Sequence, residues 1–319
     1  MNEVVRTLAP GELASAQEVL SRSCNYDNVL DIAQEKLWAP AANGLVAEPL
    51  GAFLGKQLVG VACSSGTWLR LLAVDPQHRG AGIGSKLLDA CEAQIAARGT
   101  FARTLDQPGN YLAPGIDVRN QASIAWLAKR GYQPTASACN LLINVANNAK
   151  VSDEIFASLS ERCEQQGYAI ARLSDQRLES DAAIVESAFS KGWAFEMRRA
   201  HTQSGGVHIV TQRGTQRGTQ RGTQRGTQRG TQRGSQALAG FAAHDGNNAG
   251  RGWFGPTGTL AEHRGRGLGA ALLMACLLDV RNAGHTHCQV AWIGPREFYD
   301  KIAGIDSERH FTVLRKELT

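Results

Sequence analysis

The chain has 319 residues, 43% of them hydrophobic and 20% charged, which is the composition of a globular protein with room for two domains. Six of its 34 basic residues lie in one repeat, which leaves 28 basic against 29 acidic residues elsewhere. The net charge of +5 therefore comes from the repeat and does not by itself predict a nucleic-acid partner.

Targeting and metal-binding signals are weak. No apolar run reaches the ~18–20 residues of a membrane span, and the first residues lack the apolar core of a signal peptide. The seven cysteines include no Cys-x-x-Cys pair. We therefore expect a cytoplasmic protein with reduced thiols, no membrane partner and no metal.

The first third of the chain predicts alternating strands and helices. Residues 3–8 read as a strand and 12–20 as a helix, and a helix around 29–38 is expected to face the substrate. Strands are expected at 45–53, 58–64 and 68–74.

A glycine-rich turn follows the third of these strands. After Asp75 and Pro76 come three glycines, and then a helix that ends at Gly99; the turn glycines are Gly80, Gly82 and Gly84, and the apolar helix face is Ile83, Leu87, Leu88, Cys91 and Ile95. A helix N-terminus offers unpaired N–H groups to an anion, and glycines let a diphosphate approach the backbone. The turn therefore predicts a diphosphate site.

The two commonest nucleotide motifs are not met. The glycine spacing departs from Gly-x-Gly-x-x-Gly, and the order Gly84-Ser85-Lys86 departs from the Gly-Lys-Ser/Thr of a P-loop.

The first half ends with a strand at 101–105, a loop at 107–117, a helix at 121–130 and a strand within 132–145 that is expected to close the first unit. Residues 146–150 read as a linker, and a helix capped by Ser152 follows to about residue 165. The second half then predicts a strand at 168–173, a helix at 181–189 and strands at 207–210, 237–243 and 253–260.

Residues 211–234 are six copies of Thr-Gln-Arg-Gly between two expected hairpin strands. With no aliphatic or aromatic side chain, the repeat cannot bury apolar area, and we expect a solvated, disordered loop. Two alternatives stay open: an arginine tract that binds RNA or another polyanion, and an extended two-stranded arm.

A second copy of the glycine-rich turn lies 185 positions later in the chain. Arg264, Gly267 and Gly269 match Arg79, Gly82 and Gly84. The apolar positions match as well: Leu268, Leu272, Leu273, Cys276 and Val280, with Gly284 at the stop.

The stretches VDPQHRGAGIGSKLL and GTLAEHRGRGLGAALL resemble the acetyl-coenzyme A motif of the GNAT superfamily of N-acetyltransferases. Two copies in one chain resemble the tandem GNAT arrangement, of which mycothiol synthase is an example. The resemblance implies an α/β fold with a mixed sheet and two GNAT-like domains, 1–147 and 148–319, the second carrying the 211–234 insert.

The resemblance also implies which residues hold acetyl-CoA. In the first unit these are Leu72, Ala73, Val74, Arg79, Gly80, Ala81, Gly82, Ile83, Gly84 and Ser85. In the second unit they are Gly258, Thr259, Leu260, Arg264, Gly265, Arg266, Gly267, Leu268, Gly269 and Ala270. His78 and His263 are expected to be loop residues near the phosphates.

The family's usual acid is a Tyr in a late helix, which protonates the leaving thiolate. Tyr299 is the candidate in the second unit, whereas Leu127 stands at that place in the first, so the second unit is expected to catalyse the transfer. The general base is open among Glu196, His208, His244, Asp245 and Glu262.

These observations predict an acetyl-CoA-dependent N-acetyltransferase with a small-molecule or peptide amine as acceptor. Two alternatives stay open. One is a non-catalytic acyl-CoA-binding or regulatory protein with degenerate domains, and the other is an RNA-associated protein acting through the arginine repeat.

Overall fold

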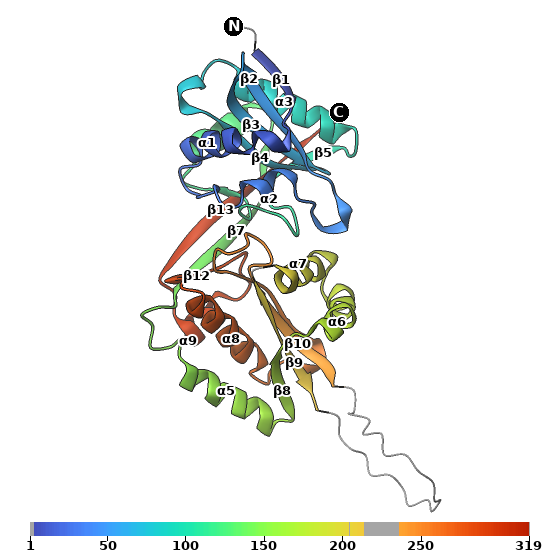
Figure 1. Ribbon diagram of the computed structural model, residues 1–319, viewed down its shortest axis with the longest axis vertical. Coiled ribbons are helices and arrows are strands. Elements are labelled where there is room, and N and C mark those ends of the chain that lie inside the picture. The colour runs from blue at the N-terminus through green and yellow to red at the C-terminus, as the bar shows by residue number, and fades with distance from the viewer. Residues whose placement is uncertain (1–2, 204, 214–235, 319) are drawn as a thin grey trace, which may run out of the picture.

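The computed structural model describes residues 3–203, 205–213 and 236–318. Their strands form one sheet in the order β1-β2-β3-β4-β5-β13-β7-β12-β11-β10-β9-β8, with β6 beside β13. Helices cover both faces, so the predicted mixed α/β fold is confirmed (Figure 1). The expectations about the repeat fall almost entirely on residues outside the described ranges. None of the described helices combines the length and the hydropathy that a membrane span needs.

The N-terminal unit is an antiparallel meander that ends in one parallel strand. The strands are β1 (Glu3–Thr7), β2 (Glu48–Leu54), β3 (Gln57–Ser65), β4 (Trp68–Val74) and the parallel β5 (Phe101–Thr104). Two helices, α1 (Leu13–Ser23) and α2 (Ala33–Trp38), pack on one face, and α3 (Ile83–Ala96) packs on the other. Short 3-10 turns lie at Pro10–Glu12, Ala42–Gly44 and Pro76–His78.

The C-terminal unit repeats this plan. Its strands are β8 (Tyr168–Arg172), β9 (Gly206–Gln212), β10 (Ala237–His244), β11 (Trp253–Thr259) and the parallel β12 (His287–Val290). Its helices are α5 (Asp153–Gln165), α6 (Asp175–Ala188), α7 (Lys191–Thr202), α8 (Leu268–Asn282) and α9 (Arg296–Ala303), with a 3-10 turn at Ala261–His263.

The two helices that follow the glycine turns bury the predicted faces. All five apolar positions of α3 and all five of α8 are buried. Additional positions of α8 are buried because α5 packs against this helix, through partly buried residues such as Phe156 and Leu159. α7 was not predicted, although Ser190 marks its start by accepting a hydrogen bond from the Trp193 N–H.

The units exchange their last strands. β7 (Gln133–Asn144) leaves the first unit and pairs with β12 of the second, while β13 (Ser307–Glu317) returns and pairs with β5 of the first. β13 and β7 also pair with each other, and both cross from one unit into the other (Figure 1). The strand expected to close the first unit therefore completes the sheet of the second, because the antiparallel partner next to β5 comes from the far end of the chain. The first unit also contributes β6 (Ile116–Asp117) and α4 (Gln121–Lys129).

Candidate functional site

The first glycine turn has the geometry that a diphosphate requires. Gly80 and Gly82 adopt φ values of +80° and +85°, and Gly82 is the N-cap of α3 without a side-chain cap. A Cβ added at either glycine would meet nothing within 4 Å. Arg79 donates from Nε to the Val74 carbonyl at 3.1 Å. No side chain caps the N–H groups at the start of α3, and neither Gly80 nor Gly82 adds a Cβ beside them.

The second glycine turn has the same backbone. Gly265 and Gly267 adopt φ values of +75° and +78°, again with open space where a Cβ would project. Arg264 donates from Nε to the Thr259 carbonyl at 3.1 Å, as Arg79 does to its own strand. The repeat seen in the sequence is thus also a repeat of conformation.

The two histidines that precede these arginines differ. His78 lines a cleft beside the first turn. His263 is buried, and its Nδ1 lies 3.0 Å from the Tyr168 hydroxyl. The second histidine is therefore held in packing with β8.

A cleft of about 540 Å³ opens beside the first turn. It lies along the part of β4 that β5 leaves unpaired: β4 and β5 pair only at Trp68–Arg103 and Leu69–Thr104 along their described lengths. The freed end of β4 lines the cleft together with the turn. Among the predicted residues, those that line it are Leu72, Ala73, Val74, Arg79, Gly80, Gly82, Gly84 and Ser85. The Ile83 side chain points into the core instead.

The cleft also has a wall that the sequence did not reveal. It comes from the segment after α1, including Cys24 and Tyr26, from residues 112–117, and from α4. Two of the lining residues, Asp27 and Asp117, bind Arg309 of β13 at 3.1 and 2.8 Å. Burial disfavours the charged Asp117, but hydrogen bonds from Arg119 and Arg309 outweigh it and hold the pKa of Asp117 well below its usual range. The residues around Arg309 in the sequence could not predict this contact, because the strand exchange is what brings Arg309 to the first unit.

The corresponding part of the second unit is filled. The C-cap residue of α6 is Phe189, whereas the C-cap of α1 is the smaller Cys24. Phe189 stacks on Trp193 with ring centroids 5.0 Å apart, and it lies so close to Gly258 that a Cβ there would approach its ring to 2.6 Å. A separate cavity of about 580 Å³ lies between the end of α6 and residues 260–264, and Leu260 and Arg264 line it.

The late helices α4 and α9 occupy equivalent places. A Cβ at Gly84 would meet Trp126 at 3.6 Å, and one at Gly269 would meet Phe298 at 3.5 Å. Trp126 therefore corresponds to Phe298, and the next residues, Leu127 and Tyr299, correspond to each other. The sequence alignment of these two positions agrees with the contacts.

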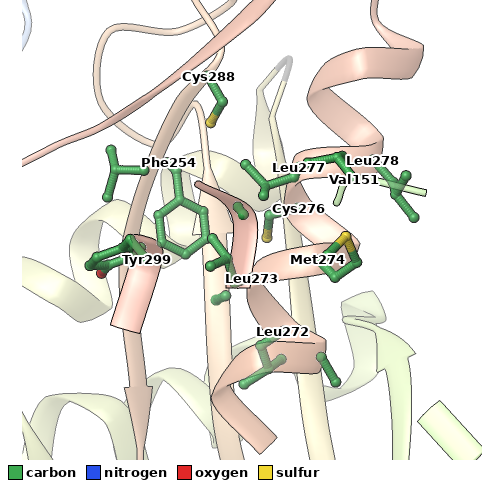
Figure 2. Packing of buried hydrophobic residues seen from close by; sticks show 14 of the residues in the cluster. Val151, Phe254, Leu272, Leu273, Met274, Cys276, Leu277, Leu278, Cys288 and Tyr299 are labelled. Atoms are coloured by element: carbon green, nitrogen blue, oxygen red, sulfur yellow. The ribbon is translucent and has the colours of Figure 1, made fainter. Parts of the chain in front are cut away.

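Tyr299 belongs to the core of the second unit. Its ring packs edge-on against Phe254 and Phe298, with centroid distances of 6.3 and 5.1 Å. Figure 2 shows the ring beside Phe254, with its oxygen directed away from that phenyl ring. Burial raises the pKa of Tyr299 to about 12, so the hydroxyl holds its proton at neutral pH. It is chemically able to donate a proton to a thiolate.

The five candidate bases lie apart from the 540 Å³ cleft, whose described lining includes none of them. His208 and His244 both contact Asp279 of α8, at 2.7 and 3.3 Å, and His244 also contacts Asp245. Glu262 lines the second cavity. The structure therefore brings His208, His244 and Asp245 together around Asp279, whereas Glu196 and Glu262 lie elsewhere.

Glu196 belongs to a buried polar cluster between the units, which we call the inter-unit polar cluster: Glu35, Lys36, Asn110, Glu196, Arg199 and Asn247. Lys36 donates to Asn110 and Asn247 at 2.9 Å each and contacts Glu35 at 2.5 Å. Glu196 accepts a hydrogen bond from the Gly109 N–H at 3.1 Å. The cluster therefore joins α2 and the 107–115 segment to α7 of the other unit.

Glu196 makes stability depend on pH. Burial raises the pKa of its carboxyl from 4.5 to about 7. The folded protein therefore keeps a proton between these values that the unfolded chain releases, and the free energy of unfolding falls as pH rises from about 4.5 to about 7. Between pH 5 and pH 7 this fall amounts to about 2 kcal/mol, and we expect Glu196→Gln to remove it. Urea unfolding of both proteins at pH 5 and pH 7 measures it.

The control for this measurement is Glu161→Gln, at an exposed position on α5, which should keep the pH dependence of the parent. Equal pH dependence in the parent and in Glu196→Gln would contradict the expectation.

Comparison with known proteins agrees with this architecture. Residues 41–134 match the model of the acetyltransferase (GNAT) domain. No curated protein sequence matches the chain.

Three solved structures share the fold over nearly the whole chain. One is the GCN5-related glucosamine N-acetyltransferase region of a fungal multi-domain GH3 β-N-acetylglucosaminidase, at 14% identity and a TM-score of 0.74, where the match covers 98% of this chain but 38% of that protein. Another is a tandem GNAT protein from the clavulanic acid biosynthesis pathway, at 15% identity and a TM-score of 0.69, covering 99% and 98%. The third is a GCN5-related N-acetyltransferase from Sphaerobacter thermophilus, at 14% identity and a TM-score of 0.62, covering 99% and 95%.

Proposed function

We propose that this chain, which has the tandem GNAT fold and carries the GNAT acetyltransferase domain in residues 41–134, transfers an acetyl group from acetyl-CoA to an amine. The observation that carries the proposal is the conjunction of an open glycine turn with a cleft of about 540 Å³ along the freed end of β4.

The residues present fit the coenzyme. N–H groups at Gly82 and the start of α3 suit the diphosphate, since no side chain caps them and the glycines carry no Cβ. Next to them, residues 71–73 present backbone groups that β5 does not pair, and these suit the amides of the pantetheine arm. The amine acceptor would then bind in the same cleft, whose lining includes the carboxylates of Asp27 and Asp117.

The geometry favours the N-terminal unit for coenzyme binding. Its cleft follows the strand end, whereas Phe189 covers the equivalent Gly258 in the second unit. The sequence favoured the C-terminal unit for catalysis, on the strength of Tyr299. Experiment can separate coenzyme binding by the N-terminal unit from catalysis by the C-terminal unit, because the first depends on Gly82 and the second on Tyr299.

Tyr299→Phe tests the second unit. If Tyr299 protonates the leaving thiolate, we expect kcat to fall by about 10²-fold or more with little change in KM, because only the transition state loses an interaction. The measurement is thiol release from acetyl-CoA over a panel of amines. Tyr168→Phe, at a buried tyrosine beside His263, is the control for loss of a buried hydroxyl. Unchanged turnover in Tyr299→Phe would remove its role as the acid.

The second candidate function is a protein that binds acetyl-CoA without transfer. Leu127 favours it, because the unit with the open cleft lacks the tyrosine of the family pattern. Calorimetry with acetyl-CoA and the amine panel discriminate between the two functions. Heat of binding with no thiol release on any amine supports binding alone, and no heat of binding contradicts both.

A further inference from the structure

Three side chains with metal-binding chemistry meet on the exchanged strands. Cys139 of β7 lies directly opposite His310 of β13 in the strand register. Glu308 is two residues from His310, so it projects from the same face of β13. This grouping joins positions 139 and 308, which is why the spacing of cysteines and histidines in the sequence predicted no metal.

The distances are close to those around one ion. Glu308 Oε2 lies 3.9 Å from Cys139 Sγ and 3.5 Å from His310 Nε2, and all three ligand atoms lie within 4.8 Å of one another. Zinc bonds of about 2.3 Å to sulfur and 2.0–2.2 Å to nitrogen or oxygen imply ligand atoms roughly 3.3–3.6 Å apart in a tetrahedron. Small side-chain rotations therefore suffice to bring the three onto a common centre.

Glu308 is already oriented for such a role. Its Oε1 accepts a hydrogen bond from Arg296 Nε at 2.6 Å, while Oε2 remains turned toward the thiol and the imidazole. Arg296 is steadied in turn by Asp300, 3.4 Å away on α9. A carboxylate held through one oxygen and free to bind a metal through the other is the usual arrangement of a ligand and its supporting partner.

We propose that Cys139, Glu308 and His310 form a Zn²⁺ site that joins β7 to β13. A thiolate with an imidazole is a donor set suited to Zn²⁺ and poorly suited to Mg²⁺ or Ca²⁺. Three protein ligands leave a fourth position for water. His310 is 61% exposed, so the ion reaches the site directly from solvent. Bound there, the ion links β7 to β13, the two strands that the units exchange.

The test is a titration of the full chain, kept reduced, with Co²⁺ as a spectroscopic probe and then with Zn²⁺. We expect one Co²⁺ per chain, with a thiolate-to-cobalt charge-transfer band that Zn²⁺ displaces. Because the metal binds only the folded chain, Zn²⁺ at 100 times its Kd should raise Tm by about 5 °C. Cys139→Ser should abolish the band, and His310→Asn should weaken binding at least about tenfold.

Two matched variants serve as controls. Cys24→Ser removes another half-buried thiol, and His287→Asn removes another strand histidine paired with a carboxylate, at 3.4 Å from Asp306. Both should keep one Co²⁺ per chain. Because the His310 side chain is mostly exposed, His310→Asn leaves the fold intact and keeps the test decisive. Absence of stoichiometric Co²⁺ binding, or a band that survives in Cys139→Ser, overturns the proposal.

Discussion

Replacing Gly82 by aspartate is expected to lower the affinity for acetyl-CoA by at least about 100-fold. The carboxylate would stand at the mouth of α3, where the bare N–H groups suit a diphosphate, and like charges at that distance repel. The positive φ of Gly82 adds strain of about 1–2 kcal/mol for any residue with a Cβ. Isothermal calorimetry with acetyl-CoA measures the loss.

Two controls separate the causes. Gly82→Ala introduces the strain without the charge, and its Cβ meets nothing within 4 Å, so it should retain most of the affinity. Gly267→Asp makes the same change in the second turn, whose backbone is equivalent. If the N-terminal unit holds the coenzyme, Gly267→Asp leaves the main binding event in place. Loss of binding in Gly267→Asp but not in Gly82→Asp would assign the coenzyme to the C-terminal unit.

The second large effect is expected on stability. Lys36→Met keeps the side-chain length and removes a buried ammonium that contacts Glu35, Asn110 and Asn247. Their oxygens then lose a donor within the inter-unit polar cluster, and breaking a buried charged contact costs about 3–5 kcal/mol. We expect the free energy of unfolding to fall by about that amount, as measured by urea denaturation.

Lys86→Met is the matched surface control. Lys86 contacts Glu3 at 2.8 Å, but its side chain is 58% exposed, so the change should stay within about 1 kcal/mol. Equal losses in the two variants would mean that burial of Lys36 does not set the strength of its contacts.

The sequence predicts best what depends on neighbours along the chain. Gly80, Gly82, Gly265 and Gly267 could be identified because a left-handed turn before an amphipathic helix leaves a local pattern of glycine and apolar spacing. The same reasoning located the buried faces of α3 and α8. These features are formed within about 20 residues.

What the sequence could not supply depends on contacts between distant segments. Arg309 reaches the first cleft on a strand from the other unit, and Phe189 fills the second unit only because α6 ends over Gly258. The sequence around these two residues does not predict which distant residues they contact. The proximity of Cys139 and His310 could likewise not be predicted, since only the pairing of β7 with β13 makes them neighbours.

The strand exchange also sets an order of events during synthesis on the ribosome. β5 is complete at Thr104, but its antiparallel neighbour extends to Glu317. At about 5–20 residues per second, the edge of β5 waits roughly 10–40 s for its permanent partner. In that interval the edge of β5 presents unpaired backbone groups, which are a template for pairing with another strand.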